Sequence, residues 1–312
     1  MKKLSIVITC LNEGENLDKT LKSIYSTADS NELDIIIVDD ASDEMSTEYT
    51  DTDGITYLRN AQRLGVAYSR DLGQYSSTSD RVMMIDAHMR FYSEGWVDLV
   101  VDRLNNSPDT LFCSSCIPTF SMDDDLGVIP HRTYGAELVL NTGMSGLARE
   151  LLEPSWKDKL EPHNKVPCVL GGCYVFNKSH YQKVRGLEGL VGWGGDEQYL
   201  SLKYWLSGGS CEVIPELEVA HLFRAEAPYT TDVFSLYFNK MFICATLMPD
   251  EIASTLMDLL PKDENFHYAT SDFRRKLAQI VEYRNYYKSI FTCDFQSTCN
   301  LINMSCDKYV QL

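Results

Sequence analysis

The chain has 312 residues, of which 44% are hydrophobic and 23% charged, and its formal net charge is −17 at pH 7. This composition excludes a disordered chain and allows a sizeable buried core. The negative charge argues against a general surface for polyanions, which bind clustered Lys and Arg, and leaves only a local basic groove open.

The N-terminal apolar run, residues 4–9, is followed by no cleavage site and is far shorter than the roughly 18 apolar residues of a membrane span. It therefore predicts a first strand, and no later segment is long enough to span a bilayer. We expect a cytoplasmic protein whose ten cysteines are reduced. Cys113 and Cys116 form a single CxxC, which favours buried thiols over a redox or zinc half-site.

Strands and helices alternate through the first third of the chain, which predicts a mainly parallel sheet with flanking helices, an α/β fold. Asn12 with Glu15 is typical of a capping box that begins the first helix, and a second helix follows Gly65. The expected strands are residues 4–9, 34–38, 55–58 and 81–85.

Polar clusters follow three of these strands, at Thr9 to Asn12, at Asp39–Asp40 and at Asp86–His88. Ligands of such sheets bind at the carboxyl ends of the strands, so we expect the three clusters to form one site. Asp86 and His88 are two residues apart, which places both side chains on the same side of an extended chain. The Asp-x-His triplet therefore predicts two ligands for a divalent cation.

Residues 107–169 show no clear pattern; the acidic run at 123–125 indicates a solvated loop, with calcium binding the minor alternative. Order returns with a strand at 173–177, a helix that begins near Asp196 and stops at Gly208, and a helix-rich tail that includes residues 273–291. Two short strands are expected at residues 212–214 and 218–220.

This order predicts a catalytic domain at residues 1–230, with a nucleotide-binding half at 1–106 and an acceptor and metal half at 107–230. A helical C-terminal extension is expected at 231–312.

Four blocks in order resemble the catalytic domain of the polypeptide N-acetylgalactosaminyltransferases and, more loosely, the family 2 glycosyltransferases, over roughly residues 4–260. They are Ile37–Asp43 (IVDDASD), Arg63–Arg70 (RLGVAYSR), Asp86–His88 with Glu94–Trp96, and Trp193–Gly195 through to His221–Arg224 and Pro228–Tyr229. The resemblance implies a GT-A fold and transfer from a nucleotide sugar, most simply a UDP-sugar.

The resemblance implies His221 as the third metal ligand. One carboxylate and two imidazoles suit Mn²⁺ better than Mg²⁺ or Ca²⁺, although another divalent cation remains open. The four other histidines at positions 131, 163, 180 and 267 are expected to be packed or solvated side chains.

The nucleotide should lie across the first strands. The backbone from Thr9 to Asn12 and a carboxylate of Asp39 or Asp40 would hold base and ribose, while the other carboxylate fixes the turn. Arg63, more than Arg70, is expected to pair with the diphosphate; either arginine is alternatively a surface ion pair. Ala87 lies between the two predicted ligands and is counted with the donor site.

The donor sugar should meet the second half of the site. Gly171 and Gly172 would let the backbone approach it, or form an ordinary turn, and Trp193 would wall the sugar ring or sit in the core. Asp196 and Glu197 are either a helix cap or the pair that binds donor hydroxyls and handles the acceptor proton. Arg224 is expected to pair with phosphate.

Departures from the family limit the inference. Asp196–Glu197 stands where the family has Glu-Asn, which resembles inverting family 2 enzymes, whereas the polypeptide transferases retain configuration. We expect this protein to lack the family's membrane anchor and lectin domain. The acceptor hydroxyl is left open between a protein, a glycan and a modified nucleic-acid base. A nucleotidyltransferase, which would need a glycine-rich basic first loop, and a non-catalytic sugar-nucleotide-binding protein are the alternatives.

Overall fold

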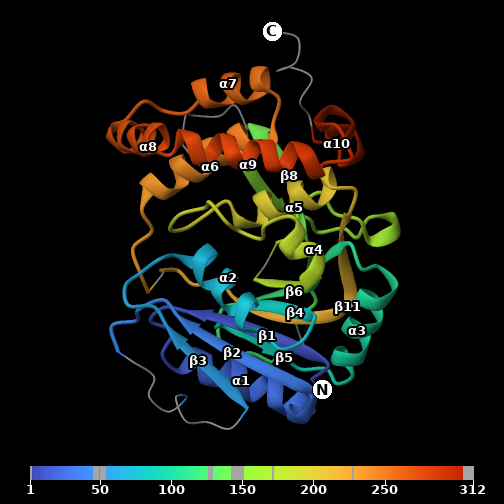
Figure 1. Cartoon of the computed structure of the whole chain (residues 1–312). Coiled ribbons are helices and arrows are strands. Elements are labelled where there is room, and N and C mark those ends of the chain that lie inside the picture. Colours follow the sequence, from blue (N-terminus) through green and yellow to red (C-terminus); the bar gives the residue numbers. More distant parts are fainter. Residues whose placement is uncertain are drawn as a thin grey trace.

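The computed structural model of the chain describes residues 2–44, 49, 54–125, 129–141, 151–170, 172–226 and 228–304. Within them a curled central sheet lies between two groups of helices. The C-terminal helices gather at one end of the molecule, and α1 lies at the other, beyond the sheet (Figure 1). The predicted α/β fold with a helical C-terminal extension is confirmed.

The central sheet is parallel in its first half and mixed in its second. Its strands run in the order β3-β2-β1-β4-β10-β6-β11-β5, and β7 pairs with β6. β10 is antiparallel to both neighbours, whereas β11 is parallel to β6. The strands are β1 (Leu4–Cys10), β2 (Leu33–Asp39), β3 (Ile55–Arg59), β4 (Arg81–Asp86), β5 (Met89–Phe91), β6 (Thr110–Thr119), β7 (Thr133–Tyr134), β10 (Cys173–Asn177) and β11 (Ser210–Leu222).

Ten α-helices are described, and a separate hairpin, β8 (Ala136–Asn141) with β9 (Leu151–Trp156), stands off the sheet. The helices are α1 (Glu15–Thr27), α2 (Val66–Ser76), α3 (Trp96–Asn106), α4 (Lys178–Lys183), α5 (Asp196–Leu206), α6 (Val233–Leu247), α7 (Asp250–Asp258), α8 (Glu264–Arg275), α9 (Leu277–Ile290) and α10 (Phe295–Leu301). None of the described helices is long and apolar enough to cross a bilayer.

Alternation along the buried strands supplies two cores. In β1, Ile6 and Ile8 point into the cluster covered by α1 and α3, while Val7 points into the opposite cluster. That second cluster is continuous from the sheet through α5 and α6 to residues of α10, including Cys299. The C-terminal helices therefore share one hydrophobic core with the sheet.

Several local predictions are corrected. Asn12 does not cap α1, because the helix begins after Gly14 without a side-chain cap. Asn12 instead adopts a φ of 56° and donates from its Nδ2 to Asp43 Oδ2 (2.8 Å). The two short strands predicted near Pro215 are one strand, β11, with a register shift between Ile214 and Glu218, where a proline is tolerated because the pairing is interrupted.

The predicted helix at residues 273–291 is likewise divided, because α8 ends at Arg275 and α9 begins at Leu277. Cys113 and Cys116 both lie buried in β6, which agrees with the prediction of packed thiols.

Candidate functional site

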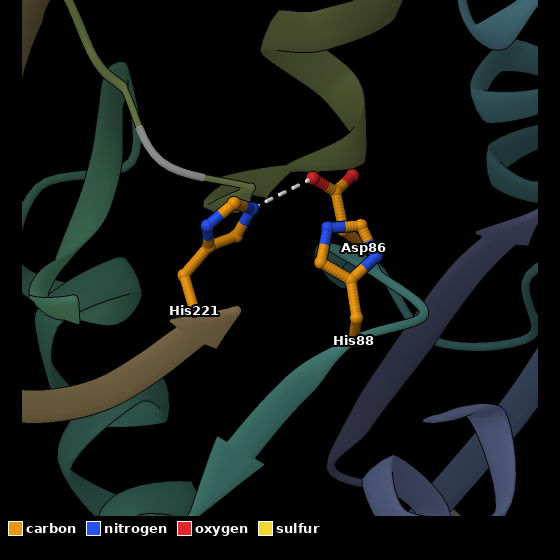
Figure 2. A group of neighbouring side chains, drawn as sticks. All are labelled: Asp86, His88 and His221. Atoms are coloured by element: carbon orange, nitrogen blue, oxygen red, sulfur yellow. Dashed lines mark ion pairs between the residues drawn. The ribbon is translucent and has the colours of Figure 1, made fainter. Parts of the chain in front are cut away.

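The described residues hold one group of three or more His, Cys, Asp and Glu side chains able to bind a metal, formed by Asp86, His88 and His221. Asp86 ends β4, His88 follows it, and His221 is the penultimate residue of β11. One ligand atom from each lies within 4.8 Å of the others. The three side chains point toward one another, although His221 is far away in the sequence (Figure 2). The two predicted ligands and the implied third are therefore neighbours.

The group has the donor chemistry of a divalent-cation site. His221 Nε2 lies 3.5 Å from Asp86 Oδ2, and His221 Nδ1 is buried without a hydrogen-bond partner. The two nitrogens of an imidazole point in different directions, so Nε2, which faces Asp86, is the atom that a shared cation would use (Figure 2). Two imidazoles and a carboxylate suit Mn²⁺ and its neighbours in the transition series. The residues present fit such an ion.

Glu13, which the sequence analysis did not single out, forms a second layer behind this group. Its Oε1 lies 3.2 Å from His88 Nδ1, and its Oε2 accepts a hydrogen bond from Arg224. Burial raises the pKa of Glu13, but the contacts with His88 and Arg224 outweigh it and leave the pKa below its usual value. A carboxylate on one imidazole nitrogen directs the other nitrogen toward a metal. Its position just after β1 was the available sequence signal.

Gly172 makes room for the metal-ligand group. Its φ is 67°, and a Cβ added there would lie 2.6 Å from Asp86 Oδ2 and 3.2 Å from His221 Cδ2. The Asp86 N–H donates to Gly172 O (2.9 Å), so β10 and β4 stay joined at this point. A side chain at Gly172 would displace both groups. Gly171 lies outside the described residues.

Arg70 connects the metal-ligand group to the second acidic cluster. Its side chain is 4% exposed, and it donates to Asp86 Oδ1 (2.9 Å) and to Asp196 Oδ2. The guanidinium also lies over the ring of Tyr174, 4.9 Å from its centroid. Although burial opposes the charge, the surrounding Tyr174, Asp196, Asp86 and Glu197 hold the pKa of Arg70 above its ordinary value. Arg70 is thus a buried bridge between two carboxylates.

Asp196 and Glu197 begin α5 directly after Gly195, which adopts a left-handed conformation. Asp196 pairs with Arg70, and α5 has no side-chain cap, so the cap alternative for Asp196 is wrong. Glu197 Oε1 accepts a hydrogen bond from Tyr174 Oη (2.6 Å). Burial, and then the charge of Asp196, raise the pKa of Glu197 to about 8. The pair thus combines a carboxylate held by Arg70 with a carboxyl group whose pKa is raised by burial.

Asp39 and Asp40 have their oxygens occupied by neighbouring donors. Asp39 accepts from the N–H (2.8 Å) and Oγ (2.6 Å) of Ser42, from Tyr57 Oη (2.8 Å) and from Arg59. Asp40 accepts from Asn60 Nδ2 (2.7 Å) and from the N–H groups of Leu64 (2.8 Å) and Gly65 (2.9 Å). Both carboxylates fix turns here, where the sequence analysis expected only one to do so.

The remaining predicted residues lie in strand β1, in the turn after β4 and in two loops. Thr9 is aligned with Asp86 across β1 and β4, and Ala87 is buried with its carbonyl accepting from Thr20 Oγ1 (2.9 Å). Trp193 is 43% exposed in the loop before α5. Arg63 is half exposed and lies 3.3 Å from Asp43 Oδ1. Arg63 therefore has the surface ion pair that was its alternative, and Arg70 has the buried position.

Comparison with known proteins gives the family and the fold of the chain. The family model described as "Glycosyl transferase family 2" matches residues 5–185. "Polypeptide N-acetylgalactosaminyltransferase 18" of Homo sapiens is 28% identical over 81% of this chain and 43% of its own length. "Polypeptide N-acetylgalactosaminyltransferase 5" of Caenorhabditis elegans is 27% identical over 73% of this chain and 38% of its own. The chain thus spans less than half the length of these two relatives.

Two solved structures share the fold. GalNAc-T7, solved with UDP, GalNAc and Mn²⁺, superposes with a TM-score of 0.69 at 17% identity, covering 96% of this chain and 56% of that one. TarS 1-349 of S. aureus, solved with UDP-GlcNAc, gives a TM-score of 0.51 at 12% identity over 92% of this chain and 79% of its own.

Proposed function

The chain belongs to glycosyl transferase family 2, and on that premise we propose that it transfers a sugar from a nucleotide-sugar donor to an acceptor hydroxyl with the help of a divalent cation. A UDP-sugar and Mn²⁺ are the simplest choices, in line with the titles of GalNAc-T7 and, for the nucleotide, of TarS. The names of the curated relatives support N-acetylhexosamine as the sugar class and a protein hydroxyl as the acceptor.

The group of Asp86, His88 and His221 carries this proposal, because it offers one carboxylate oxygen and two imidazole nitrogens within 4.8 Å of one another. These residues would hold the cation, which neutralises the negative charge that builds on a departing diphosphate. Glu13 keeps His88 oriented and holds Arg224 beside the group, within reach of a phosphate oxygen.

The donor sugar would lie between the metal-ligand group and the acidic pair. Asp196, which is paired with Arg70, would accept hydrogen bonds from donor hydroxyls. Glu197 would hold or move the acceptor proton, since its pKa of about 8 lies near neutral pH. Gly172 would let the backbone approach the sugar, and Trp193 would cover one of its faces.

The nucleotide would lie along the ends of β1 and β4, against Thr9, Asn12 and Ala87, with Arg63 the exposed cation for its diphosphate. Asp39 and Asp40 would then act on base and ribose through the turns they fix, because their oxygens already have donors. Arg70 would fix the positions of the Asp86 and Asp196 carboxylates and balance their charges. Its burial favours this role over direct contact with phosphate.

A thermal-shift series tests the function. Wild-type protein is heated with Mn²⁺ and each of a panel of UDP- and GDP-sugars. A donor at about 100 times its dissociation constant raises the free energy of unfolding by about 2.7 kcal/mol, which is a clear shift of the midpoint. Turnover is then followed as UDP release with and without acceptor, and product NMR gives the anomeric configuration.

The matched control is His221→Ala, which removes one ligand and should abolish the shift that requires Mn²⁺. Calorimetry that finds no sugar nucleotide bound to the wild type, with metal and without it, would sink the proposal. Binding without any transfer or hydrolysis would favour the non-catalytic alternative.

A further inference from the structure

We propose that helix α6 holds the catalytic loop in place and that Asn239, in its middle, is a positioning residue for Asp196 and Glu197. The loop consists of residues 187–195, which lead directly into α5 and carry Trp193. The inference deepens the proposed function and rests on it, because it concerns the geometry of the same acidic pair. It also assigns a role to the C-terminal helices.

Asn239 joins the helix to the loop through its side-chain amide, which is buried at 1% exposure. Its Oδ1 accepts from the Val191 N–H (2.8 Å). Its Nδ2 donates to Val191 O (2.8 Å) and to Gly194 O (2.7 Å). Both halves of the amide are used, and only a side chain with an acceptor and two donors at this length does so. The loop backbone is therefore fixed on both sides of Trp193.

The glycines of the loop are explained by the same contact. Gly192 and Gly194 have φ values of 54° and 95°, which already favour glycine. A Cβ added at Gly192 would overlap Ser235 Oγ, and one added at Gly194 would lie 2.6 Å from Leu236 Cδ2. Ser235 and Leu236 belong to the first turn of α6. The glycines therefore let the loop backbone rest directly on the helix.

The opposite side of the loop is held by the start of α2. Gly65 forms an isolated parallel bridge with Gly192, and the Val66 N–H donates to Gly192 O (3.2 Å). Helix α2 also carries Arg70, which pairs with Asp196 at the end of the loop. The loop is thus clamped between α2 and α6.

The clamp makes α6 part of the catalytic unit, although α6 follows the predicted domain boundary at residue 230. Reacting groups displaced by about 1 Å lose on the order of a hundredfold in rate. These hydrogen bonds of Asn239 go to the loop backbone. They reach neither the metal-ligand group nor the side chains of Asp196 and Glu197. Its loss should change the rate of transfer and spare the affinity for the cation.

The test compares Asn239→Ala with Thr246→Ala in the full chain. Thr246 is a matched control, because it is equally buried in α6 and its Oγ1 donates to Phe242 O (2.7 Å) inside the helix. Hydrogen exchange is measured on peptides covering residues 187–195, which needs no enzyme activity. Binding of Mn²⁺ alone and the kcat for the best donor are measured in parallel.

In Asn239→Ala we expect the rate of hydrogen exchange at the Val191 amide to rise about fivefold or more, because about one hydrogen bond is lost. Affinity for Mn²⁺ should stay within about twofold and kcat should fall about tenfold to a hundredfold. Thr246→Ala should lower the unfolding midpoint while leaving the loop peptides and kcat near wild type.

Equal exchange in the loop peptides of both variants would overturn the clamp, and faster exchange with an unchanged kcat would overturn the positioning role. A wild type that transfers no sugar would instead refute the proposed function, and the exchange data would still decide whether Asn239 holds the loop.

Discussion

Two acidic clusters follow β2 and β4, the strands on either side of β1, and they differ in what is left for a ligand. After β2, Asp39 and Asp40 have donors on their oxygens from the turns around them. After β4, Asp86 and the two imidazoles of His88 and His221 bring three ligand atoms within 4.8 Å of one another. The first cluster is closed by the protein's own hydrogen-bond donors, whereas in the second the ligand atoms converge in a way that suits a cation.

An acidic residue at the end of a strand is therefore not by itself a binding group. A carboxylate that accepts several backbone and hydroxyl hydrogen bonds stabilises its turn and has little capacity left for a ligand. A carboxylate that lies beside two imidazoles can instead share a divalent cation with them. Substitutions in the two clusters should therefore separate stability from metal binding.

The largest effect is expected for His221→Ala, which leaves Asp86 and His88 with two ligands of three. Transfer should fall by about 10³, the several kcal/mol that a metal contributes to charge neutralisation. Without metal the unfolding free energy should fall by about 1 kcal/mol, because the variant loses the 3.5 Å contact of His221 Nε2 with Asp86 Oδ2. Calorimetry with Mn²⁺ and a urea titration check both values. An unchanged Mn²⁺ affinity would contradict the proposal that the cluster after β4 binds the cation through His221.

Glu13→Gln should weaken Mn²⁺ binding by about 10- to 100-fold, because the neutral amide holds the His88 ring less firmly and loses its charge pairing with Arg224. Electron paramagnetic resonance of free Mn²⁺ measures the affinity directly. Glu15→Gln is the control, since the Glu15 side chain is 88% exposed on α1. Equal affinity in the two variants would remove Glu13 from the site.

Asp39→Ala should destabilise the fold by about 1–3 kcal/mol, because it strands the Ser42 and Tyr57 donors in a buried turn. Its affinity for Mn²⁺ should match the wild type. Chemical denaturation and metal titration on the same preparation give both numbers. Weaker binding of the sugar nucleotide without a loss of stability would contradict the conclusion that the protein's own hydrogen-bond donors occupy this cluster.

Glu197→Gln should change how the stability of the protein depends on pH. The folded-state pKa of Glu197 is raised above its unfolded value of 4.5, so its stabilising protonated form is complete below that value and is lost as pH rises through about 8. The amide does not titrate and keeps the hydrogen bond from Tyr174.

As pH rises between these two values, the free energy of unfolding of the variant should therefore increase relative to that of the wild type. The difference should reach at least about 1 kcal/mol, the equivalent of one pKa unit. Unfolding midpoints at pH 5 and pH 8.5 measure the gap. A gap that closes with rising pH would contradict a raised pKa.

The smallest effect on stability is expected for Arg63→Ala, within about 0.5 kcal/mol, because its pair with Asp43 is exposed. This makes the variant a clean probe of donor binding. A tenfold loss of donor affinity at unchanged stability would mark Arg63 as the diphosphate ligand that the sequence predicts. Unchanged donor affinity would exclude it from that role.

The sequence by itself determined the features that depend on near neighbours along the chain. Apolar runs of strand length alternating with helical periodicity predicted the α/β order, and the Asp-x-His spacing placed Asp86 and His88 together. His221 was distinguished from the four histidines set aside by its place after a predicted short strand, and only the resemblance made it the third ligand. The cytoplasmic location and the domain boundary stay predictions.

The tertiary structure decided everything that depends on distant pairing. Arg70 and Asp196 are 126 positions apart, and Glu13 and Arg224 are 211 apart, so no periodicity joins them. The same holds for Asn239, whose partners lie on a loop 45 to 48 positions before it. Which carboxylates are satisfied and which stay open follows from these pairings, because a hydrogen-bond donor acts by its position in space and not by its place in the chain.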